Sequence, residues 1–434
     1  MKLTAGMRIA FSYKGQALKG TVLNEEKERI VVKLDSGYNL SARPDEIKDE
    51  KALKDAPAKK AQKAVQTKAA KPKPGLPRIH LLHTGGTIAS RVDYTTGAVI
   101  AQYTADEVLS LYPELLEIAN VKSKLLANMQ SEMMRFAHWN VLARAVEEAV
   151  KEGAQGVIIT HGTDILAMSA AALSFALENL TIPVILVGSQ RSSDRPSSDA
   201  VSNLLCAATF IAREGKAFPG VGICMHESTE KDDCVILPAC RTRKMHTSRR
   251  DAFRAINDEP YARIAYPTMT VERLKAYPKA PAGKLMLKPF DEQLKIGLLV
   301  AHPQMWAAEL LAYKTFDGLV LELLGIGHAP TMKTDAHNAE NERILKAIAE
   351  LAKRMPVAAA PQTIYGRVDM DVYSPGRQLI AAGVLGQGLD MVPETAFVKL
   401  AWLLSNHKQD VRKLYGEDLR GEISARSPKD GFSE

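Results

Sequence analysis

Short runs of consecutive apolar residues alternate, over most of the chain, with longer stretches in which apolar positions recur every three or four residues. The short runs predict strands buried on both faces, as in parallel sheets, and the longer stretches predict helices with one apolar side. From residue 78 onward this alternation indicates an α/β fold with parallel sheets. Strands are expected at 79–83, 156–160, 183–188, 220–225, 295–300, 318–323 and 356–360, and helices at 140–152, 165–179, 341–354 and 395–406.

The first 50 residues follow a different pattern, in which apolar and polar residues alternate one by one over short segments. Such segments at 8–13, 20–23 and 29–34, followed by the turn residues Asp35-Ser36-Gly37, predict a small all-β domain that resembles an SH3-like barrel. A unit of this size is marginally stable by itself, so we expect it to dock on another folded unit.

Residues 51–77 separate this domain from the α/β part. The segment is rich in lysine and alanine and ends in a proline-rich run, 71–77, which cannot continue a helix and favours an extended chain. Together with Arg78 it carries nine basic residues and one acidic residue, whereas the whole chain has a formal net charge of +7, so the rest is close to neutral. A solvated linker and a tract that attracts nucleic acid without sequence preference both fit this charge.

The predicted organisation is a β domain at 1–50, a linker at 51–77 and two α/β domains at 78–290 and 291–434. The stretch at about 250–292, with its scattered prolines, is expected to be a connection.

The overall composition is that of a globular protein. Of the 434 residues 46% are hydrophobic and 25% are charged, and no apolar run approaches the length needed to span a membrane. The four cysteines show no CxxC spacing, which disfavours a disulfide framework or a zinc ribbon and favours reduced thiols. We therefore expect a cytoplasmic protein that makes no membrane contact.

Two of the expected strands lead directly into loops that combine glycine with a hydroxyl group. The strand at 79–83 runs into Thr84-Gly85-Gly86-Thr87, and the strand at 156–160 runs into His161-Gly162-Thr163-Asp164. Ligands bind at such strand ends in open α/β sheets, and glycine allows the backbone to approach them closely. A third segment places Lys244 in a basic stretch. Threonine hydroxyls, an aspartate and a lysine supply a nucleophile and a base that activates it, which favours an amidohydrolase.

Each of these residues also has a purely structural interpretation. Thr87 can cap a helix after a glycine turn, Asp164 can cap the helix that follows it, and Lys244 can be one charge of a solvated stretch. The phosphate-binding pattern GxxxxGK[ST] is absent from the sequence, and the histidines lack the spacing of zinc ligands, so we expect no catalytic metal.

The order of these motifs resembles that of the L-asparaginase/glutaminase family. The resemblance covers about 78–434, and the matching segments are 84–89, 93–97, 129–131, 160–164, 187–191 and 243–248. It implies an asparaginase-like fold with two α/β domains. It also implies that Thr87 attacks the amide carbon of the substrate and that Thr163, Lys244 and Asp164 form a proton relay.

The same resemblance implies roles in substrate binding. Tyr94 would activate or orient the nucleophile, Ser131 would hydrogen-bond the substrate α-carboxylate, and Ser189 would offer backbone groups to the leaving amide. Bacterial members take an acidic residue for the substrate amine from a neighbouring subunit, and Asp369 and Asp371 are the candidates for that role here.

One branch of the family resembles this chain further, because it shares the added N-terminal domain and the segments 248–253 and 391–402. In that branch the amidohydrolase is a subunit of a tRNA-dependent amidotransferase. The resemblance therefore implies a homodimer core and an α2β2 assembly with a partner subunit. That partner would bind the tRNA and use ATP and Mg²⁺, while this chain would hold no cofactor and would supply ammonia from Gln or Asn.

Two other interpretations compete with that one. A free-standing cytosolic L-asparaginase would use the same site but has no need of the segment 1–77. A nucleic-acid-binding module built on an inactive amidohydrolase is disfavoured, because every candidate catalytic position is filled.

Overall fold

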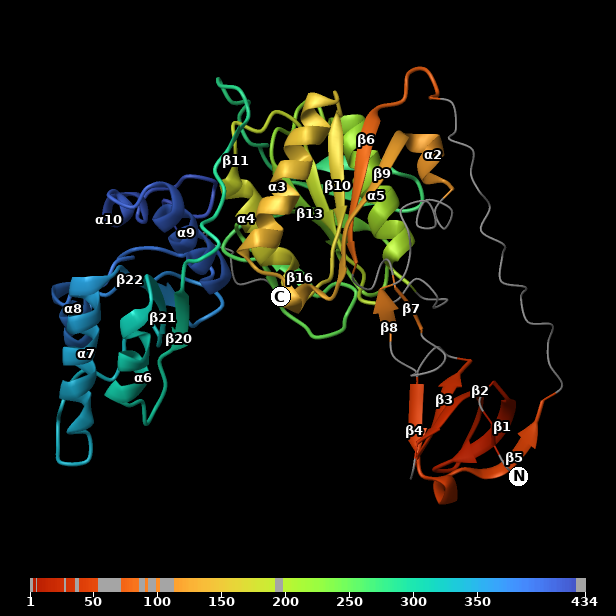
Figure 1. The fold of residues 1–434 in the computed structure, drawn as a ribbon, viewed down its shortest axis with the longest axis horizontal. Helices are drawn as coiled ribbons and strands as arrows, with labels where there is room; N and C mark the ends of the chain where they lie inside the picture. The colour runs from red at the N-terminus through yellow and green to blue at the C-terminus, as the bar shows by residue number, and fades with distance from the viewer. Residues whose placement is uncertain are drawn as a thin grey trace.

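The structure is a computed structural model, and it describes residues 3–4, 6–26, 29–35, 39–53, 72–85, 90–92, 99–101, 113–191 and 198–426. Three main sheets follow one another along the chain: one near the N-terminus, a large central one, and a smaller one toward the C-terminus (Figure 1).

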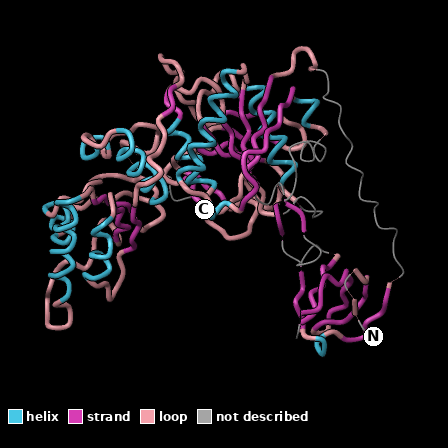
Figure 2. The backbone as a smooth tube through the Cα atoms, in the orientation of Figure 1, coloured by secondary structure: helices cyan, strands magenta, loops and turns pink. Residues whose placement is uncertain are grey.

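The N-terminal sheet consists of β1 (Arg8–Tyr13), β2 (Gln16–Glu26), β3 (Arg29–Leu34), β4 (Asn39–Ala42) and β5 (Lys48–Ala52), with the short 3-10 helix η1 (Pro44–Glu46) before the last strand. Among the described residues it has five antiparallel strands in the order β4-β3-β2-β1-β5, and Figure 2 shows this part as almost entirely strand. Lys14 and Gly15 both have positive φ, which suits the two-residue turn between β1 and β2. Ile9, Phe11 and Val32 belong to a small core, so the predicted all-β unit is confirmed.

The central sheet contains β6 (Arg78–Gly85), β9 (Asn120–Met129), β10 (Gly156–Thr160), β12 (Val184–Val187), β13 (Val221–His226), β14 (Cys234–Pro238), β17 (Ala262–Ala265) and β18 (Thr270–Arg273). Within the described ranges its order is β18-β17-β14-β13-β12-β10-β6-β9. The strands from β9 to β13 pair in parallel, and β14, β17 and β18 continue the sheet antiparallel.

Helices cover both faces of this sheet (Figure 1). They are α2 (Leu115–Ile118), α3 (Phe136–Lys151), α4 (Leu166–Ala176) and α5 (Ala200–Glu214). Val157 and Ile159 of β10 belong to the core that contains α3 and α4, whereas Ile158 between them belongs to the core that contains α2 and α5. Successive side chains of a strand point to opposite faces, so a strand covered on both must be apolar throughout.

Shorter elements complete this part of the chain. The pairs are β7 (Ser90–Val92) with β8 (Val99–Ala101), β11 (Leu177–Glu178) with β19 (Met286–Leu287), and β15 (Thr242–Lys244) with β16 (Phe253–Ala255), and a 3-10 helix η3 spans Ser131–Met133. We call the described residues from β6 to β19 the first lobe.

The stretch 250–292 is more than the connection that the sequence suggested. It contains β16 to β19, and two of these strands extend the central sheet. The prolines of this stretch favoured an irregular connection. Pro267, however, lies in the turn between β17 and β18, where no strand hydrogen bond requires the backbone N–H that proline lacks. Here tertiary pairing outweighs a weak local signal.

The second lobe runs from residue 296 to residue 426. Its strands β20 (Ile296–Val300), β21 (Gly318–Leu323) and β22 (Val357–Pro361) form a parallel sheet in the order β20-β21-β22 among the described residues. Its helices are α6 (Ala307–Leu311), η4 (Ala312–Thr315), α7 (Glu340–Arg354), α8 (Ser374–Ala381), α9 (Pro393–Asn406) and α10 (Val411–Leu414). The predicted stripe of α7 is buried, with Ile344, Ile348 and Leu351 against Leu319 and Leu321 of β21.

Helix α9 joins the two lobes. Its apolar residues share one core with α4 of the first lobe and with Val320 and Ala358 of the second sheet. The rings of Phe175 in α4 and Trp402 in α9 are 5.4 Å apart between centroids. The fold is thus the predicted α/β class preceded by an all-β part, while the exact domain boundaries stay a prediction.

Two further observations concern the whole described chain. No helix within it is both long and apolar enough to cross a membrane. The four cysteines, all within the described ranges, are buried and free.

Candidate active site

The carboxyl ends of three adjacent parallel strands meet at one edge of the central sheet. Along this edge His83 of β6 is paired with Thr160 of β10, and Thr160 with Val187 of β12. The loops that follow these strands therefore start side by side, although they are far apart in the sequence. This is the edge at which open α/β sheets bind ligands.

Hydrogen bonds between β6 and β10 fix the base of this edge. His83 Nδ1 lies 2.8 Å from Thr160 Oγ1, and the other ring nitrogen lies 2.9 Å from Ser123 Oγ. The Thr84 hydroxyl donates to the carbonyl of Thr160 at 2.9 Å. All these groups except Ser123 are fully buried, so the two loops leave the sheet from a rigid platform.

Gly85 is required where β6 ends. Its φ is +98°, and a Cβ atom there would lie 2.6 Å from both the backbone nitrogen and the carbonyl oxygen of Met129. Only glycine fits this combination of left-handed backbone and close approach to a neighbouring strand. Thr87 and Tyr94, the predicted nucleophile and its activator, lie outside the described residues, so their roles stay predictions.

The second loop brings a threonine, an aspartate and a lysine together. Lys244 Nζ donates to Thr163 Oγ1 at 2.9 Å and to Asp164 Oδ1 at 2.8 Å. Thr163 is 8% exposed and the Lys244 side chain 17%, whereas the Asp164 side chain is 62% exposed. The three residues that the sequence interpretation grouped, Thr163, Lys244 and Asp164, are therefore in contact in the structure.

A hairpin delivers Lys244 to this loop. Lys244 is the last residue of β15 and is paired with Phe253 of β16, which is buried in the core of the first lobe. Thr163 and Asp164 lie just before α4, which begins at Leu166. The free N–H groups of that helix end add positive potential where negative charge would develop.

Ser131 lies against the same loop. A Cβ atom on Gly162 would lie 2.8 Å from both Cβ and Oγ of Ser131, so these residues are in van der Waals contact. Ser131 is 2% exposed, and its hydroxyl has no hydrogen-bond partner within the described part of the chain. A buried hydroxyl without a partner beside the threonine is suited to bind a polar group of a substrate.

The loop after β12 completes this edge. A Cβ atom on Gly188 would lie 2.8 Å from Thr163 Cγ2, so this loop is adjacent to the threonine. The Ser189 hydroxyl is turned away and donates to Asp199 Oδ1 at 2.8 Å. Any contact of Ser189 with a leaving amide must therefore use backbone groups, as the sequence interpretation proposed, and that role stays a prediction.

Asp199 is a functional neighbour that sequence reasoning did not identify. This buried carboxylate accepts from the backbone N–H groups of Gln190 and Arg191 and from Asn203 Nδ2, at 3.0 to 3.2 Å. It thus fixes the loop after β12 by charge-assisted hydrogen bonds. In the sequence Asp199 stands directly before an apolar helix. That pattern predicts a helix cap and does not by itself predict a residue that fixes a neighbouring loop.

Burial keeps the two histidines of the platform neutral. Loss of hydration lowers the pKa of His83 to about 4, and it lowers the pKa of His161 to about 4, although a hydrogen bond to the Gly162 carbonyl opposes the shift. Neither histidine carries a charge near neutral pH. Within the described residues no group of three or more His, Cys, Asp or Glu side chains is placed to hold a metal ion.

The two acidic candidates for the substrate amine lie in the second lobe. Gln387 Nε2 donates to Asp369 Oδ1 at 2.7 Å and to Asp371 Oδ2 at 3.0 Å. The amide of one glutamine thus holds both carboxylates in a fixed arrangement, and their use in binding stays a prediction.

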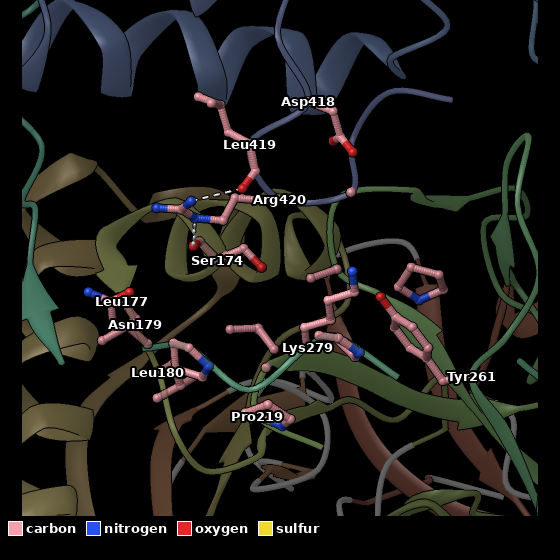
Figure 3. Close-up of a pocket in the computed structure, with 17 residues that line it drawn as sticks. Ser174, Leu177, Asn179, Leu180, Pro219, Tyr261, Lys279, Asp418, Leu419 and Arg420 are labelled. Carbon is pink, nitrogen blue, oxygen red and sulfur yellow. Dashed lines mark hydrogen bonds between the residues drawn. The ribbon is translucent and has the colours of Figure 1, made fainter. Parts of the chain in front are cut away.

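A separate cavity of about 500 Å³ lies beside the start of β13, and Figure 3 shows the residues that line it. Gly220 and Val221 at the start of β13 line it, together with Arg420 of the C-terminal segment. The Arg420 guanidinium donates to the carbonyls of Ser174 and Leu419, each at 2.8 Å. Two of its nitrogens are thus paired within the chain, whereas Nη2 has no hydrogen-bond partner among the described residues and lies 3.8 Å from Glu178 Oε1. None of the residues that line this cavity belongs to the loops after β6, β10 and β12.

Comparison with known proteins identifies the class to which this fold and site belong. Residues 78–277 match the family model for the N-terminal domain of asparaginase, and residues 295–414 match that for the glutaminase/asparaginase C-terminal domain. The solved structure of the thermostable L-asparaginase from Thermococcus kodakarensis is similar, with a TM-score of 0.69 and 32% identity, over 80% of this chain and 100% of that one. The chain therefore belongs to the asparaginase/glutaminase family of amidohydrolases.

Curated relatives place it more narrowly. It is 42% identical over 406 residues to the D subunit of the glutamyl-tRNA(Gln) amidotransferase of Pyrococcus furiosus, a match that covers 92% of this chain and 88% of the relative. It is 40% identical over 423 residues to the protein of the same name from Archaeoglobus fulgidus, covering 96% and 95%. Within the family, the chain belongs with the D subunits of archaeal glutamyl-tRNA(Gln) amidotransferases.

Proposed function

We propose that this chain hydrolyses the side-chain amide of L-glutamine, or of L-asparagine, and supplies the ammonia to a partner subunit. The partner would use the ammonia to convert Glu-tRNA(Gln) to Gln-tRNA(Gln). The observation that carries the proposal is the contact of one lysine ammonium with both Thr163 Oγ1 and Asp164 Oδ1. The names of the D-subunit relatives support the use of the ammonia.

The chemistry assigned to the site is acyl transfer through a threonine. The hydroxyl of Thr87 or Thr163 attacks the amide carbon and gives up its proton, the carbon–nitrogen bond breaks, and ammonia leaves. Water then hydrolyses the resulting ester and releases the free acid. Lys244, in its neutral form, accepts the proton from the Thr163 hydroxyl, and Asp164 holds the ammonium that results. The lysine then gives this proton to the departing nitrogen, which leaves as NH3.

Substrate positioning is assigned to groups around that loop. The hydroxyl of Ser131, which has no hydrogen-bond partner among the described residues, would bind the substrate α-carboxylate. Tyr94 would activate or orient the attacking threonine. Asp164, with its exposed side chain, can also face the substrate ammonium. Backbone groups of Ser189 would contact the leaving amide.

The assembly assigned to the chain is an α2β2 complex built on a homodimer of this subunit. The partner subunit would bind the tRNA and carry out the ATP- and Mg²⁺-dependent activation of the glutamate. That division fits a chain whose charge outside the basic segment 51–78 is close to neutral, because tight tRNA binding requires many cationic contacts.

A free-standing L-asparaginase is the second candidate function. Its support is the similarity to the Thermococcus kodakarensis L-asparaginase over the full length of that enzyme. Residues 1–77 distinguish the two candidates, because an asparaginase has no use for an additional antiparallel β unit.

Ammonia release from glutamine and asparagine tests the proposal, first with the purified chain and then with the partner subunit, ATP and Glu-tRNA(Gln). We expect low release by the chain alone and a strong rise on adding partner and charged tRNA. Full activity that is indifferent to both would favour the asparaginase. Thr87→Val and Thr163→Val should each lower release by about a thousandfold or more with the fold intact. Retention of activity in both variants would contradict the threonine mechanism.

Removal of residues 1–50 tests the role of the β unit. We expect hydrolysis by the truncated chain to continue while its stimulation by the partner weakens. Collapse of hydrolysis itself would make the β unit part of the catalytic core.

A further inference from the structure

The segment that carries Lys244 presents alternate residues to the two lobes. Thr242 and Lys244 contact the first lobe. The Thr242 hydroxyl donates to the Pro238 carbonyl at 2.6 Å, and Lys244 Nζ donates to Thr163 Oγ1. Arg241 and Arg243 form ion pairs with carboxylates of the second lobe instead. This division follows from the strand period of two, which sends neighbouring side chains to opposite faces.

The first of these arginines is anchored in a buried network. The Arg241 guanidinium donates to Asp390 Oδ2 at 2.9 Å, to the Gly421 carbonyl at 3.1 Å and to Ser424 Oγ at 2.7 Å. Ser424 N in turn donates to the other Asp390 oxygen at 3.0 Å. Both charged side chains are almost fully buried, so loss of one partner would leave an uncompensated charge in the interior.

The second arginine pairs with the start of α9. Arg243 Nε lies 3.1 Å from Glu394 Oε1, and each side chain is 25% exposed. The next residue of the helix, Thr395, donates its hydroxyl to the Cys240 carbonyl at 2.9 Å. The first turn of α9 is thus tied to the chain on both sides of Arg241. Because α9 packs in the core shared by both lobes, its position depends on how the lobes meet.

Lysine has a flexible stem of four methylene groups, so contacts at its tip do not by themselves fix its backbone. The strand β15 is only three residues long and is paired with β16 on one edge. An additional anchor on the residue before Lys244 therefore limits the movement of its Cα atom. Small misplacement of a catalytic group is costly, because about 1 Å can lower a rate by about a hundredfold.

We propose that Arg243 and Glu394 are positioning residues for Lys244, through which the second lobe holds the lysine against Thr163 and Asp164. The inference rests on the proposed role of Lys244 in amide hydrolysis. Neither residue touches the substrate in this proposal. Their effect is on the rate of the chemical step and not on substrate affinity.

Steady-state ammonia release from L-glutamine by the full chain tests the proposal in Glu394→Gln, Arg243→Gln and the double variant. Rates are normalised to the folded fraction measured by thermal unfolding. We expect each single variant to lower kcat by about tenfold or more with KM changed less than about twofold. The double variant should be no slower than the slower single variant, because both act on one contact. Arg243→Lys keeps the cation and should recover part of kcat.

Asp258→Asn is the matched control. Asp258 forms an ion pair with Lys275 at 2.5 Å, with side-chain exposures of 24% and 20%, and this pair involves neither β15 nor α9. The variant should leave kcat unchanged, since a merely structural loss of an ion pair changes stability and not the turnover of folded enzyme.

The proposal is overturned if kcat of both single variants equals that of the wild type, if only KM changes, or if their effects multiply in the double variant. The variant Lys244→Ala distinguishes failure of the positioning role from failure of the proposed function. If Lys244→Ala retains full activity, the catalytic role of the lysine is wrong. If it is inactive while Glu394→Gln and Arg243→Gln are fully active, the lysine acts as proposed and the positioning role is wrong.

Discussion

Gly162 and Ser131 are packed so closely that no side chain can stand between them. A Cβ atom on Gly162 would lie 2.8 Å from Cβ and Oγ of Ser131 and 3.1 Å from its backbone nitrogen. The contact joins the loop that carries Thr163 to the start of η3, two segments that the sequence separates by about thirty residues. It thus places a buried hydroxyl, which has no hydrogen-bond partner among the described residues, next to the loop that carries Thr163.

Gly162→Ala should therefore impair substrate binding more than folding. The added methyl group must displace Ser131 or the loop, which costs about 1–3 kcal/mol of stability and moves the proposed α-carboxylate site. We expect KM for glutamine to rise by about tenfold or more. Gly416→Ala is the control, because only one atom, the Lys413 carbonyl oxygen at 3.9 Å, lies near the added methyl group there. An unchanged KM in Gly162→Ala would remove Ser131 from the binding site.

Asp164→Asn should separate activity from stability. The Asp164 side chain is 62% exposed, so its ion pair with Lys244 contributes no more than about 1 kcal/mol to folding. Loss of the charge that holds the lysine should lower kcat by about a hundredfold. The matched control is Glu148→Gln, whose 58% exposed carboxylate pairs with Lys124 at 2.8 Å and should leave both quantities unchanged. Equal activity of the two variants would contradict the relay.

Gly85→Ala should destabilise the protein through contact as well as through backbone conformation. Both Gly85 and Gly75 have positive φ, which costs an L-residue about 1–2 kcal/mol. Only at Gly85 would the new methyl group meet backbone atoms, those of Met129 at 2.6 Å. We expect Gly85→Ala to lower the free energy of unfolding by at least about 2 kcal/mol more than Gly75→Ala, as measured by urea unfolding. Similar losses in the two variants would show that the contact is relieved at little cost.

The protein should lose stability as the pH falls from about 6.5 to about 4. Burial lowers the pKa of His83 and that of His161 to about 4 in the folded state, from an ordinary value of 6.5. Between these values the unfolded chain binds more protons than the folded chain, so unfolding becomes more favourable on acidification. Each histidine can contribute on the order of 3 kcal/mol across this window.

Unfolding free energies between pH 4 and 7 test this in His161→Asn, which keeps a donor for the Gly162 carbonyl. At pH 5 the number of protons that His161→Asn takes up on unfolding should be smaller than that of the wild type by about one proton per molecule. His302→Gln should not reduce the acid loss, because hydrogen bonds to Pro303 and Glu309 raise the pKa of the exposed His302. An unaltered slope in His161→Asn would mean that His161 is charged in the folded state.

Elements buried on both faces were predictable from the sequence. The strand expected at 156–160 is β10 with the same bounds, because a continuous apolar run between polar ends has few alternatives. The helix expected at 165–179 ends at Ala176 instead, because Leu177 and Glu178 pair with Leu287 and Met286. The expected strands did not include β14, although Cys234–Pro238 is a continuous buried run, or β17. Antiparallel pairing holds both in the sheet, β14 between β13 and β17 and β17 between β14 and β18.

The residues that could carry the chemistry were recognisable from the sequence, since a glycine-containing loop after a buried strand and a lysine in a family motif are local features. That Thr163, Asp164 and Lys244 lie in contact depends on the tertiary structure. Lys244 reaches Thr163 across 81 positions of sequence because β15 folds back on β16 and because Arg241 and Arg243 are held by the second lobe. No local pattern encodes such a contact, because it depends on how two separately folded sheets pack around α9.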